Sequence, residues 1–544
     1  MAEAQNPNRY DAIVVGGGHN GLVAAAYLAK HGARTVVLES RPKTGGAADT
    51  MSPWPEAPDI KVTTLSYVMS LMPPSIQRDL QLERFGYKIY PQGMGYLPHP
   101  SGRSIVRHES RERTRESIAT FSKKDAAAYF EFEEWIGGVA NILGPLLMET
   151  PSHLGSKKTK DLKDVAQLGW QLRKEIDERR VADITRLFTM SATDLLDRWF
   201  ESPVLKGFMA VNGIIGTWAG PDAPGTAYVL MHHSVGDVGD GQIASWGYPE
   251  GGMGAVSRAC EDSARFFGAE IRTGARVGRI LTSNGRVRGV ALDGGEELTA
   301  PIVVTAIHPK ITFLEQLPAS ELPAEFVRDI EHWRTRSGTV KINLAVSELP
   351  EFTADPGFDP QIHGGAIQVL DDVDYLERAF QEARFGKAAT LPFSDTAIPT
   401  VFDKTLAPEG VHVVSMFTQW VPQEWADEDG HEADLDAYAD RLIERVNDVA
   451  PNFKGSIMHR QVIGPKQMQD EWGLIGGNIF HGELSVDQLF HMRPAPGYAD
   501  YRTPIAGLYQ ASSATHAGGG VTGMPGHHCV REILKDKARR KRRK

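Results

Sequence analysis

The sequence predicts an α/β fold that joins a parallel-sheet domain to a second domain of mixed α+β structure. The chain opens with an apolar strand at residues 10–15, an alanine-rich helix at 20–31 and a second apolar strand at 34–39. This strand–helix–strand order is typical of a parallel sheet. Segments of the same character return in the middle and at the end of the chain, and long helical and mixed segments separate them.

The later α/β segments are predicted in the following order. A helix is expected at 256–267, strands at 270–280, 287–292 and 302–306, and, near the end, a strand at 507–511, a glycine loop and a helix through Leu534. Alternating or continuous apolar runs between Gly-rich turns predict the strands, and helical spacing of apolar residues predicts the helices.

The segments in between have a different pattern. Residues 110–235 are mostly helical by spacing, with an amphipathic stretch at 161–180 that continues at 192–200. Further on, strands at 340–346 and 411–417 precede a helix at 434–449.

A chain of 544 residues is too long for one hydrophobic core. We therefore expect a discontinuous first domain and a second domain packed on it. The first comprises residues 1–65, 245–335 and 495–544, and the second comprises 66–244 and 336–494, with a basic tail at 535–544.

Composition excludes several classes of protein. The net charge of −10 does not favour binding to nucleic acid. Only Cys260 and Cys529 are present, so there is no disulfide framework, no Cys-x-x-Cys redox pair and no thiolate metal site. Residues 1–11 have no apolar core like that of a signal peptide, and no run of 18 apolar residues occurs. We expect a cytoplasmic protein.

The first strand-to-helix turn carries the strongest motif. Gly16, Gly18 and Gly21 have the G-x-G-x-x-G spacing between a strand and a helix, and Glu39 ends the next strand. Gly16 permits the tight turn, Gly18 lets the backbone approach a pyrophosphate, and Gly21 lets the helix pack on the strand. Glu39 is placed to accept hydrogen bonds from a ribose. A chance glycine turn with a surface glutamate is the alternative.

A second glycine pair follows the acidic residue. Arg41, Gly45 and Gly46 bring another backbone segment toward the pyrophosphate, which favours FAD over NAD. An ordinary Pro-Gly loop is the other interpretation.

The last glycine loop favours a flavin. Gly518, Gly520 and Gly523 repeat the spacing, but no second strand or acidic residue follows. A strand, a glycine loop and a helix N-terminus stabilise negative charge, which reduced flavin carries near N1 and O2.

The chain resembles the phytoene desaturase-like branch of the FAD-dependent amine oxidase superfamily. It is most similar to the pyridine nucleotide-disulphide oxidoreductase domain-containing protein 2 family. The matching segments are 14–21 with 39–46, then 249–254, 476–483, 488–494 and 501–526. The resemblance implies a glutathione-reductase-type (Rossmann-like) FAD domain interleaved with an α+β substrate domain. It also implies that Val277 contacts the adenine through its backbone. Because the redox cysteines are absent, it does not imply disulfide chemistry.

We predict non-covalent binding of FAD. The predicted cofactor-binding residues are Gly16, Gly18, His19, Asn20, Gly21, Glu39, Ser40, Arg41, Gly45, Gly46, Ala47, Val277, Ser513, Gly520, Val521 and Thr522.

Three residues are candidates for catalysis. His516 lies beside the last glycine loop, where it would contact the flavin or move a proton, or else cap the helix. His481 and Glu483 are candidates for the substrate cavity wall, and a structural role in their glycine-rich turn is the alternative. His308 and the pair His232-His233 are interpreted as turn and packing residues, because no further ligand stands at metal spacing.

The predicted reaction moves hydride between flavin N5 and an apolar substrate that is polyene-, isoprenoid- or acyl-like. It is of desaturase, dehydrogenase or isomerase type. Residues 204–218 and 62–72 would form an apolar slot, or simply core. One alternative is an amine oxidase, with Trp472 and Tyr498 as candidates for its aromatic cage. Another is an FAD-binding regulatory protein with little turnover.

The remaining predictions concern partners. The basic tail is a solvated, disordered charge run or a contact with an anionic membrane surface. A homodimer stays open, and dioxygen or a quinone would accept the electrons.

Overall fold

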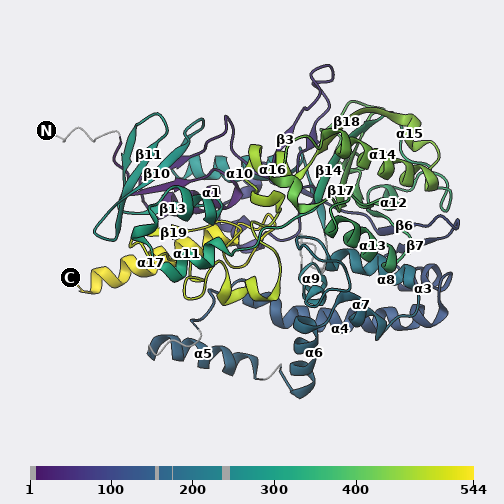
Figure 1. Ribbon diagram of the computed structural model, residues 1–544, viewed down its shortest axis with the longest axis horizontal. Coiled ribbons are helices and arrows are strands. Elements are labelled where there is room, and N and C mark those ends of the chain that lie inside the picture. The colour runs from purple at the N-terminus through teal and green to yellow at the C-terminus, as the bar shows by residue number, and fades with distance from the viewer. Residues whose placement is uncertain (1–7, 154–158, 174–175, 236–245, 544) are drawn as a thin grey trace.

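Two large β-sheets stand in opposite halves of the molecule, one parallel and the other mainly antiparallel (Figure 1). The computed structural model describes residues 8–153, 159–173, 176–235 and 246–543. Most of the helices between α3 and α9 lie below the larger sheet in this view. Within the described ranges, no helix combines the length and the apolar character needed to cross a bilayer.

The parallel sheet has five strands in the order β19-β13-β1-β2-β9. Their bounds are Leu508–Gln510, Val303–Thr305, Ala12–Val15, Thr35–Leu38 and Glu270–Arg272. The strands β1, β2 and β13 are buried throughout, which is why their sequences are continuous apolar runs.

Three helices cover this sheet. Helix α1 (His19–Lys30) packs against both α10 (Met253–Phe266) and α17 (Met524–Arg543). Small residues permit the close approach: a Cβ on Gly526 of α17 would lie 2.3 Å from the Asn20 carbonyl oxygen. The first and last segments of the chain therefore meet.

The strand predicted at 270–280 is wrong as one element. Residues Glu270–Arg272 pair with β2, whereas Val277–Ser283 (β10) belongs to a separate antiparallel sheet with β11 (Arg286–Leu292) and β12 (Glu297–Thr299). Gly274 has φ +63° and turns the chain between them. A left-handed residue cannot continue a strand.

The larger sheet has seven strands in the order β18-β14-β17-β16-β15-β6-β7. Their bounds are Ile457–Ile463, Thr339–Val346, His412–Gln419, Phe393–Ala397, Ala366–Val369, Gly95–Pro98 and Ser104–Arg107. The strands predicted at 340–346 and 411–417 are confirmed as β14 and β17, and the helix predicted at 434–449 as α14 (Glu432–Val449).

The helical layer predicted for 110–235 is confirmed. It contains α3 (Arg111–Ala119), α4 (Lys123–Leu147), α5 (Thr159–Leu172), α6 (Glu178–Thr189), α7 (Ala192–Asp197), α8 (Pro203–Ala210) and α9 (Thr226–His232). The stretch 161–180 is not one helix. Asp177 caps a new helix by accepting a hydrogen bond from the Arg180 amide at 2.8 Å, and residues 174–175 lie outside the described residues.

Shorter elements connect these layers. They are α2 (Pro74–Asp79), α11 (Ala324–Glu331), α12 (Pro360–His363), α13 (Val373–Arg384), α15 (Phe453–Ser456), α16 (Pro465–Trp472), β3 (Thr50–Met51), β4 (Val62–Thr63), β5 (Ile89–Pro91) and β8 (Gly247–Pro249).

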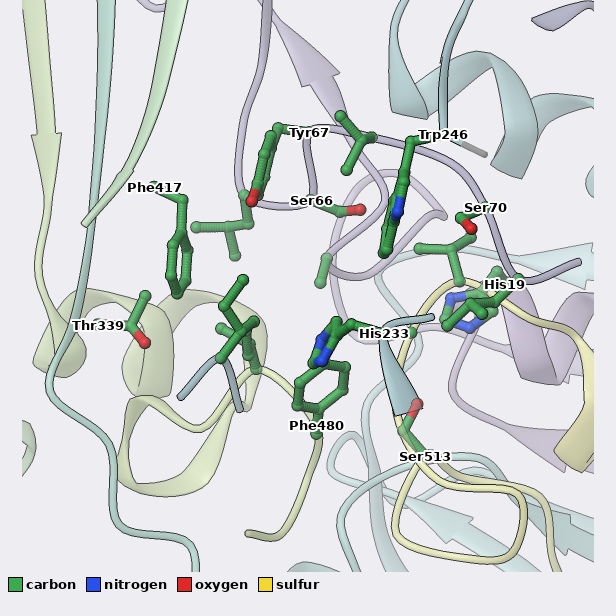
Figure 2. Close-up of a pocket in the computed structure, with 18 of the residues that line it drawn as sticks. His19, Ser66, Tyr67, Ser70, His233, Trp246, Thr339, Phe417, Phe480 and Ser513 are labelled. Atoms are coloured by element: carbon green, nitrogen blue, oxygen red, sulfur yellow. The ribbon is translucent and has the colours of Figure 1, made fainter. Parts of the chain in front are cut away.

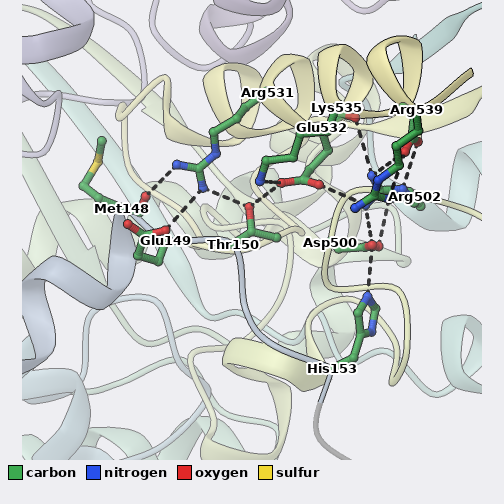
Figure 3. Close-up of polar contacts among 11 residues, drawn as sticks. Met148, Glu149, Thr150, His153, Asp500, Arg502, Arg531, Glu532, Lys535 and Arg539 are labelled. Carbon is green, nitrogen blue, oxygen red and sulfur yellow. Dashed lines mark hydrogen bonds and ion pairs between the residues drawn. The ribbon is translucent and has the colours of Figure 1, made fainter. Parts of the chain in front are cut away.

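The basic tail is helical, so the prediction of disorder is wrong. Helix α17 continues to Arg543 and is exposed toward its end. Lys and Arg are good helix formers. Arg502 also anchors the helix by binding Glu532 at 3.1 Å and Asp536 at 2.8 Å, and Arg531 binds Thr150 at 2.9 Å (Figure 3).

Candidate cofactor and substrate site

A cavity of about 1540 Å³ runs from the carboxyl ends of β1 and β13 to the face of the larger sheet. Figure 2 shows His19 and Ser513 toward one end, Tyr67 and Phe417 toward the other, and His233, Trp246 and Phe480 between them. We call the first the dinucleotide end and define it by residues 16–20, 39–47 and 513–521. The second is the sheet end and is defined by Tyr67, Lys341, Gln368, Asp395 and Phe417.

The glycines of the first turn have the geometry that their spacing predicts. Gly16 has φ +97°, and a Cβ on Gly21 would lie 2.1 Å from the Gly16 carbonyl oxygen. A Cβ on Gly18 would meet nothing within 4 Å, because this residue faces the cavity. Helix α1 begins here without a side-chain cap, so its first amides are available to an anion.

Glu39 is buried and holds this turn to the next loop. Its Oε2 accepts a hydrogen bond from the Gly17 amide at 2.7 Å, and its Oε1 accepts one from the Arg41 amide at 2.8 Å. The carboxylate also lines the cavity, and its remaining lone pairs leave it able to accept from a ribose hydroxyl.

The second glycine pair touches the first turn. The Gly45 amide donates to the Gly17 carbonyl at 2.9 Å, and a Cβ on Gly46 would lie 3.3 Å from Gly18 Cα. Arg41 donates to the Gly46 carbonyl at 3.3 Å and to Asp49 at 3.1 Å. The two loops thus form one wall of the dinucleotide end.

The last glycine loop closes this end from the opposite terminus. Asn20 Nδ2 donates to Ser513 Oγ at 3.2 Å across 493 residues of sequence. Ser513, Gly520 and Val521 line the cavity together with Val277. Of the predicted cofactor residues, Gly21, Gly45 and Thr522 do not line it: the two glycines make backbone contacts, and Thr522 Oγ1 accepts from the Met524 amide at 3.1 Å.

Three buried histidines also line the cavity, namely His19, His308 and His481. Burial lowers the pKa of His19 and of His481 to about 4 and that of His308 well below its usual range, so all three are neutral. His308 Nδ1 accepts from the Lys310 amide at 3.2 Å, which leaves Nε2 as the N–H donor; that nitrogen has no partner among the described residues. An unpaired buried donor beside a cavity indicates a ligand acceptor.

The structure does not bring His516 or Glu483 into the cavity wall. The His516 ring nitrogen Nε2 lies 3.1 Å from the Leu146 carbonyl, and burial lowers its pKa to about 4. Glu483 is bound by Arg336 at 2.7 Å. These are packing and ion-pair contacts, and they support the structural alternative stated for each residue.

Sequence reasoning missed Arg493, which joins the loops around the cavity. Its exposed fraction is 1%, and no described carboxylate pairs with it. The guanidinium donates to the carbonyls of Ser513 at 2.8 Å and Phe480 at 2.9 Å and lies 5.1 Å from the centre of the Trp333 ring. Burial lowers its pKa to about 9, so it stays charged at neutral pH. The segment 488–494 was noted as a motif, but nothing in it revealed the partners.

The polar residues of the sheet end were also missed. Lys341 is buried, and burial lowers its pKa to about 7; burial raises the pKa of Asp395 to about 6. The signal in the sequence was a lysine inside an otherwise apolar strand. Its cavity-facing neighbours come from other strands, which a single sequence does not align.

The middle of the cavity is apolar. Phe208, Met209 and Ile215 line it from one predicted segment, and Leu65 and Val68 from the other. The predicted slot is therefore a ligand wall rather than only core. His232 and His233 are both buried, and His233 stacks on Trp246 with the ring centres 6.3 Å apart. Among the described residues, no group of three metal-ligand side chains occurs.

The residues proposed for an aromatic cage do not meet. Trp472 lies against Arg41 at the dinucleotide end, with the guanidinium 5.3 Å from the ring centre. Tyr498 packs on Phe326 at 4.8 Å between ring centres and does not line the cavity. Instead, Tyr67 and Phe417 stack at the sheet end, 6.0 Å apart.

Neither cysteine is near a disulfide partner. Cys260 and Cys529 are free and buried. Burial raises the pKa of the Cys260 thiol to about 12 and also raises that of Cys529. Both act as packing residues, since the reactive form of cysteine is the thiolate.

The parallel sheet, the glycine loops and the covering sheet define a class of protein. The fold is the mixed α/β fold of FAD-dependent amine oxidases and related oxidoreductases. Residues 14–81 match the family described as NAD(P)-binding Rossmann-like domain. A solved structure of putrescine oxidase bound to putrescine superposes with a TM-score of 0.58 at 15% identity, covering 97% of this chain and 99% of that one.

Sequence comparison gives the family itself. The chain is 38% identical over 548 residues to pyridine nucleotide-disulfide oxidoreductase domain-containing protein 2 of Rattus norvegicus, covering 97% of this chain and 94% of the relative. The chain therefore belongs to that family, as its motifs had indicated. A limonene dehydrogenase polypeptide of Castellaniella defragrans is 24% identical over 552 residues, covering 97% of this chain and 94% of that one.

Proposed function

We propose that the protein holds FAD non-covalently at the dinucleotide end and moves hydride between the flavin and an apolar, isoprenoid- or polyene-like substrate. One observation carries the proposal: a single cavity connects both glycine loops to an apolar slot. A dinucleotide and its substrate can therefore lie in one water-poor space.

The residues present fit FAD. The open space at Gly18, the uncapped start of α1 and the unpaired Nε2 of His308 are suited to a ligand rich in phosphate and hydroxyl acceptors. Glu39 would bind the adenosine ribose, and Val277 the adenine. Ser513, Gly520 and Val521 would lie at the flavin end.

When bound, FAD supplies a hydride acceptor at N5 of its ring system. The task of the chain is to align the substrate and to exclude water, which needs no acid–base residue. Phe208, Met209 and Ile215 suit that task because they line the middle of the cavity. The contacts of His516 and Glu483 favour supporting roles for those two side chains.

The substrate class has independent support. The relative named as a limonene dehydrogenase polypeptide matches nearly the whole chain, and limonene is an apolar isoprenoid. We further propose dioxygen or a quinone as the electron acceptor.

The test is an anaerobic titration of the purified full chain with limonene, a polyene and benzylamine while the flavin spectrum is recorded. Bleaching by limonene or the polyene is expected. Bleaching by benzylamine alone would make the protein an amine oxidase. Bound flavin that no compound reduces would instead favour a regulatory FAD-binding protein.

We also propose that the exposed end of α17 contacts anionic membranes. Arg539, Arg540, Lys541 and Arg542 project there as a dense positive charge, and each basic residue contributes about 1 kcal/mol near such a surface. A chain ending at Asp536 should sediment less with phosphatidylserine vesicles than the full chain. Equal sedimentation of the two chains would contradict this contact.

A further inference from the structure

A row of side chains crosses the larger sheet at the sheet end of the cavity. In the strand register, Lys341 of β14 lies opposite Phe417 of β17, Phe417 lies opposite Asp395 of β16, and Asp395 lies opposite Gln368 of β15. Side chains opposite one another in neighbouring strands share a face of the sheet. All four line the cavity, so three polar groups face a space that is otherwise apolar.

Each polar group keeps unused hydrogen-bonding capacity. Gln368 has an exposed fraction of 5%, and its Oε1 has no partner among the described residues. Tyr67 donates to Asp395 Oδ2 at 2.7 Å, and the described residues provide no donor to Oδ1. Lys341 Nζ donates to Asn343 and Ser415, each at 2.5 Å, and an ammonium has three donors.

The two charges do not satisfy each other. No ion pair joins Lys341 to Asp395, because the strand that carries Phe417 separates theirs and two strand spacings place their backbones roughly 10 Å apart. The Tyr67 ring lies over Phe417 in that gap, 5.8 Å from Lys341 Nζ. Unpaired buried polar groups are unfavourable, so a ligand group that pairs with them would gain affinity.

The pattern selects the kind of group. An ammonium would face Lys341, and a carboxylate would face Asp395. A hydroxyl both donates and accepts, so it can donate to Asp395 or Gln368 and accept from Lys341. We propose that this row is a subsite for the hydroxyl group of an otherwise apolar substrate, so that the protein takes an isoprenoid-like alcohol in preference to the matching hydrocarbon. This inference rests on the proposed function, which places the apolar body in the slot.

The test compares geraniol with its hydrocarbon counterpart, 2,6-dimethyl-2,6-octadiene. The FAD-loaded full chain is titrated anaerobically, and Kd is obtained from the perturbation of the flavin spectrum and from tryptophan fluorescence, since Trp246 lines the cavity. Geraniol should bind about tenfold or more tightly than the hydrocarbon, as expected for a hydrogen bond to a charged group. Geranylamine should show no such gain.

Two variants and a control locate the effect. Gln368→Leu and Asp395→Asn should each reduce the preference for geraniol several-fold while leaving the Kd of the hydrocarbon nearly unchanged. Thr396→Val removes a buried hydroxyl from the same strand, where it pairs with Ser394 at 2.8 Å away from the cavity, and should leave the preference intact. If Asp395→Asn fails to fold, Gln368→Leu alone decides.

The outcomes separate the two proposals. Equal binding of geraniol and the hydrocarbon, or a preference that survives both variants, would overturn the hydroxyl subsite and leave the proposed function standing. A protein that retains no flavin, or that binds neither probe, would overturn the proposed function together with the subsite.

Discussion

The two ends of the cavity differ in which part of the chain meets the ligand. At the dinucleotide end the wall is mostly backbone: glycine loops, the start of α1 and carbonyl groups. At the sheet end it is made of side chains that come from four separate strands. The comparison teaches that the cofactor end is determined by local conformation, whereas the substrate end is determined by strand register. Substitutions should therefore act differently at the two ends.

The largest expected effect is at Gly18. Gly18→Leu should reduce FAD affinity by about 100-fold or more, because the new side chain enters the open space that the pyrophosphate would use. Its φ of −68° tolerates a side chain, so folding should be preserved. Isothermal titration of FAD measures the loss. Gly455→Ala, which also has free space around its Cβ but lies outside the cavity, is the control, and normal binding by the leucine variant would break the comparison.

The next effect is at Arg493, which links the loops of both ends. Arg493→Met should lower the free energy of unfolding by about 3 kcal/mol, because several buried carbonyl oxygens lose their donor. Arg493→Lys should lose less, since it keeps the charge but not the planar fork. Denaturant titration measures both. Two variants as stable as wild type would show that this link is dispensable.

Lys341 should produce a pH effect that belongs to the sheet end. Its folded-state pKa is about 7 against 10.5 for a free lysine, so the unfolded chain binds more protons between these values. Stability contributed at this position should therefore rise with pH above 7. Relative to Lys341→Met, wild type should gain about 2 kcal/mol between pH 7 and pH 9, measured by unfolding at both pH values. A constant difference would mean that the lysine is not desolvated.

The smallest effect is at Glu39. Glu39→Gln should weaken FAD binding about tenfold, because a neutral acceptor replaces a charged one while the bonds from Gly17 and Arg41 can persist. The same titration measures it. If this side chain mattered more than Gly18, the dinucleotide end would depend on side chains rather than on backbone.

Much of the dinucleotide end could be predicted from the sequence, since glycine spacing dictates local conformation. Gly16, Gly18 and Gly21 have the expected geometry, and Ser513 meets Asn20 as the two glycine loops suggested. The failures are non-local. The strand at 270–280 divides between two sheets at Gly274.

Other misses share that cause. The partners of Arg493 and the row from Lys341 to Gln368 depend on contacts between distant segments. The basic tail is helical because Arg502, far back in the chain, binds Asp536. A lone sequence shows that His516 and Glu483 are polar residues in glycine-rich loops, but not that they point away from the cavity.

The most direct measurement is the flavin content of the purified full chain, determined by releasing the cofactor from denatured protein and quantifying it. One FAD per chain is expected, with tight rebinding to the stripped protein and none to Gly18→Leu. A colourless protein that does not take up added FAD would contradict the assignment of the dinucleotide end.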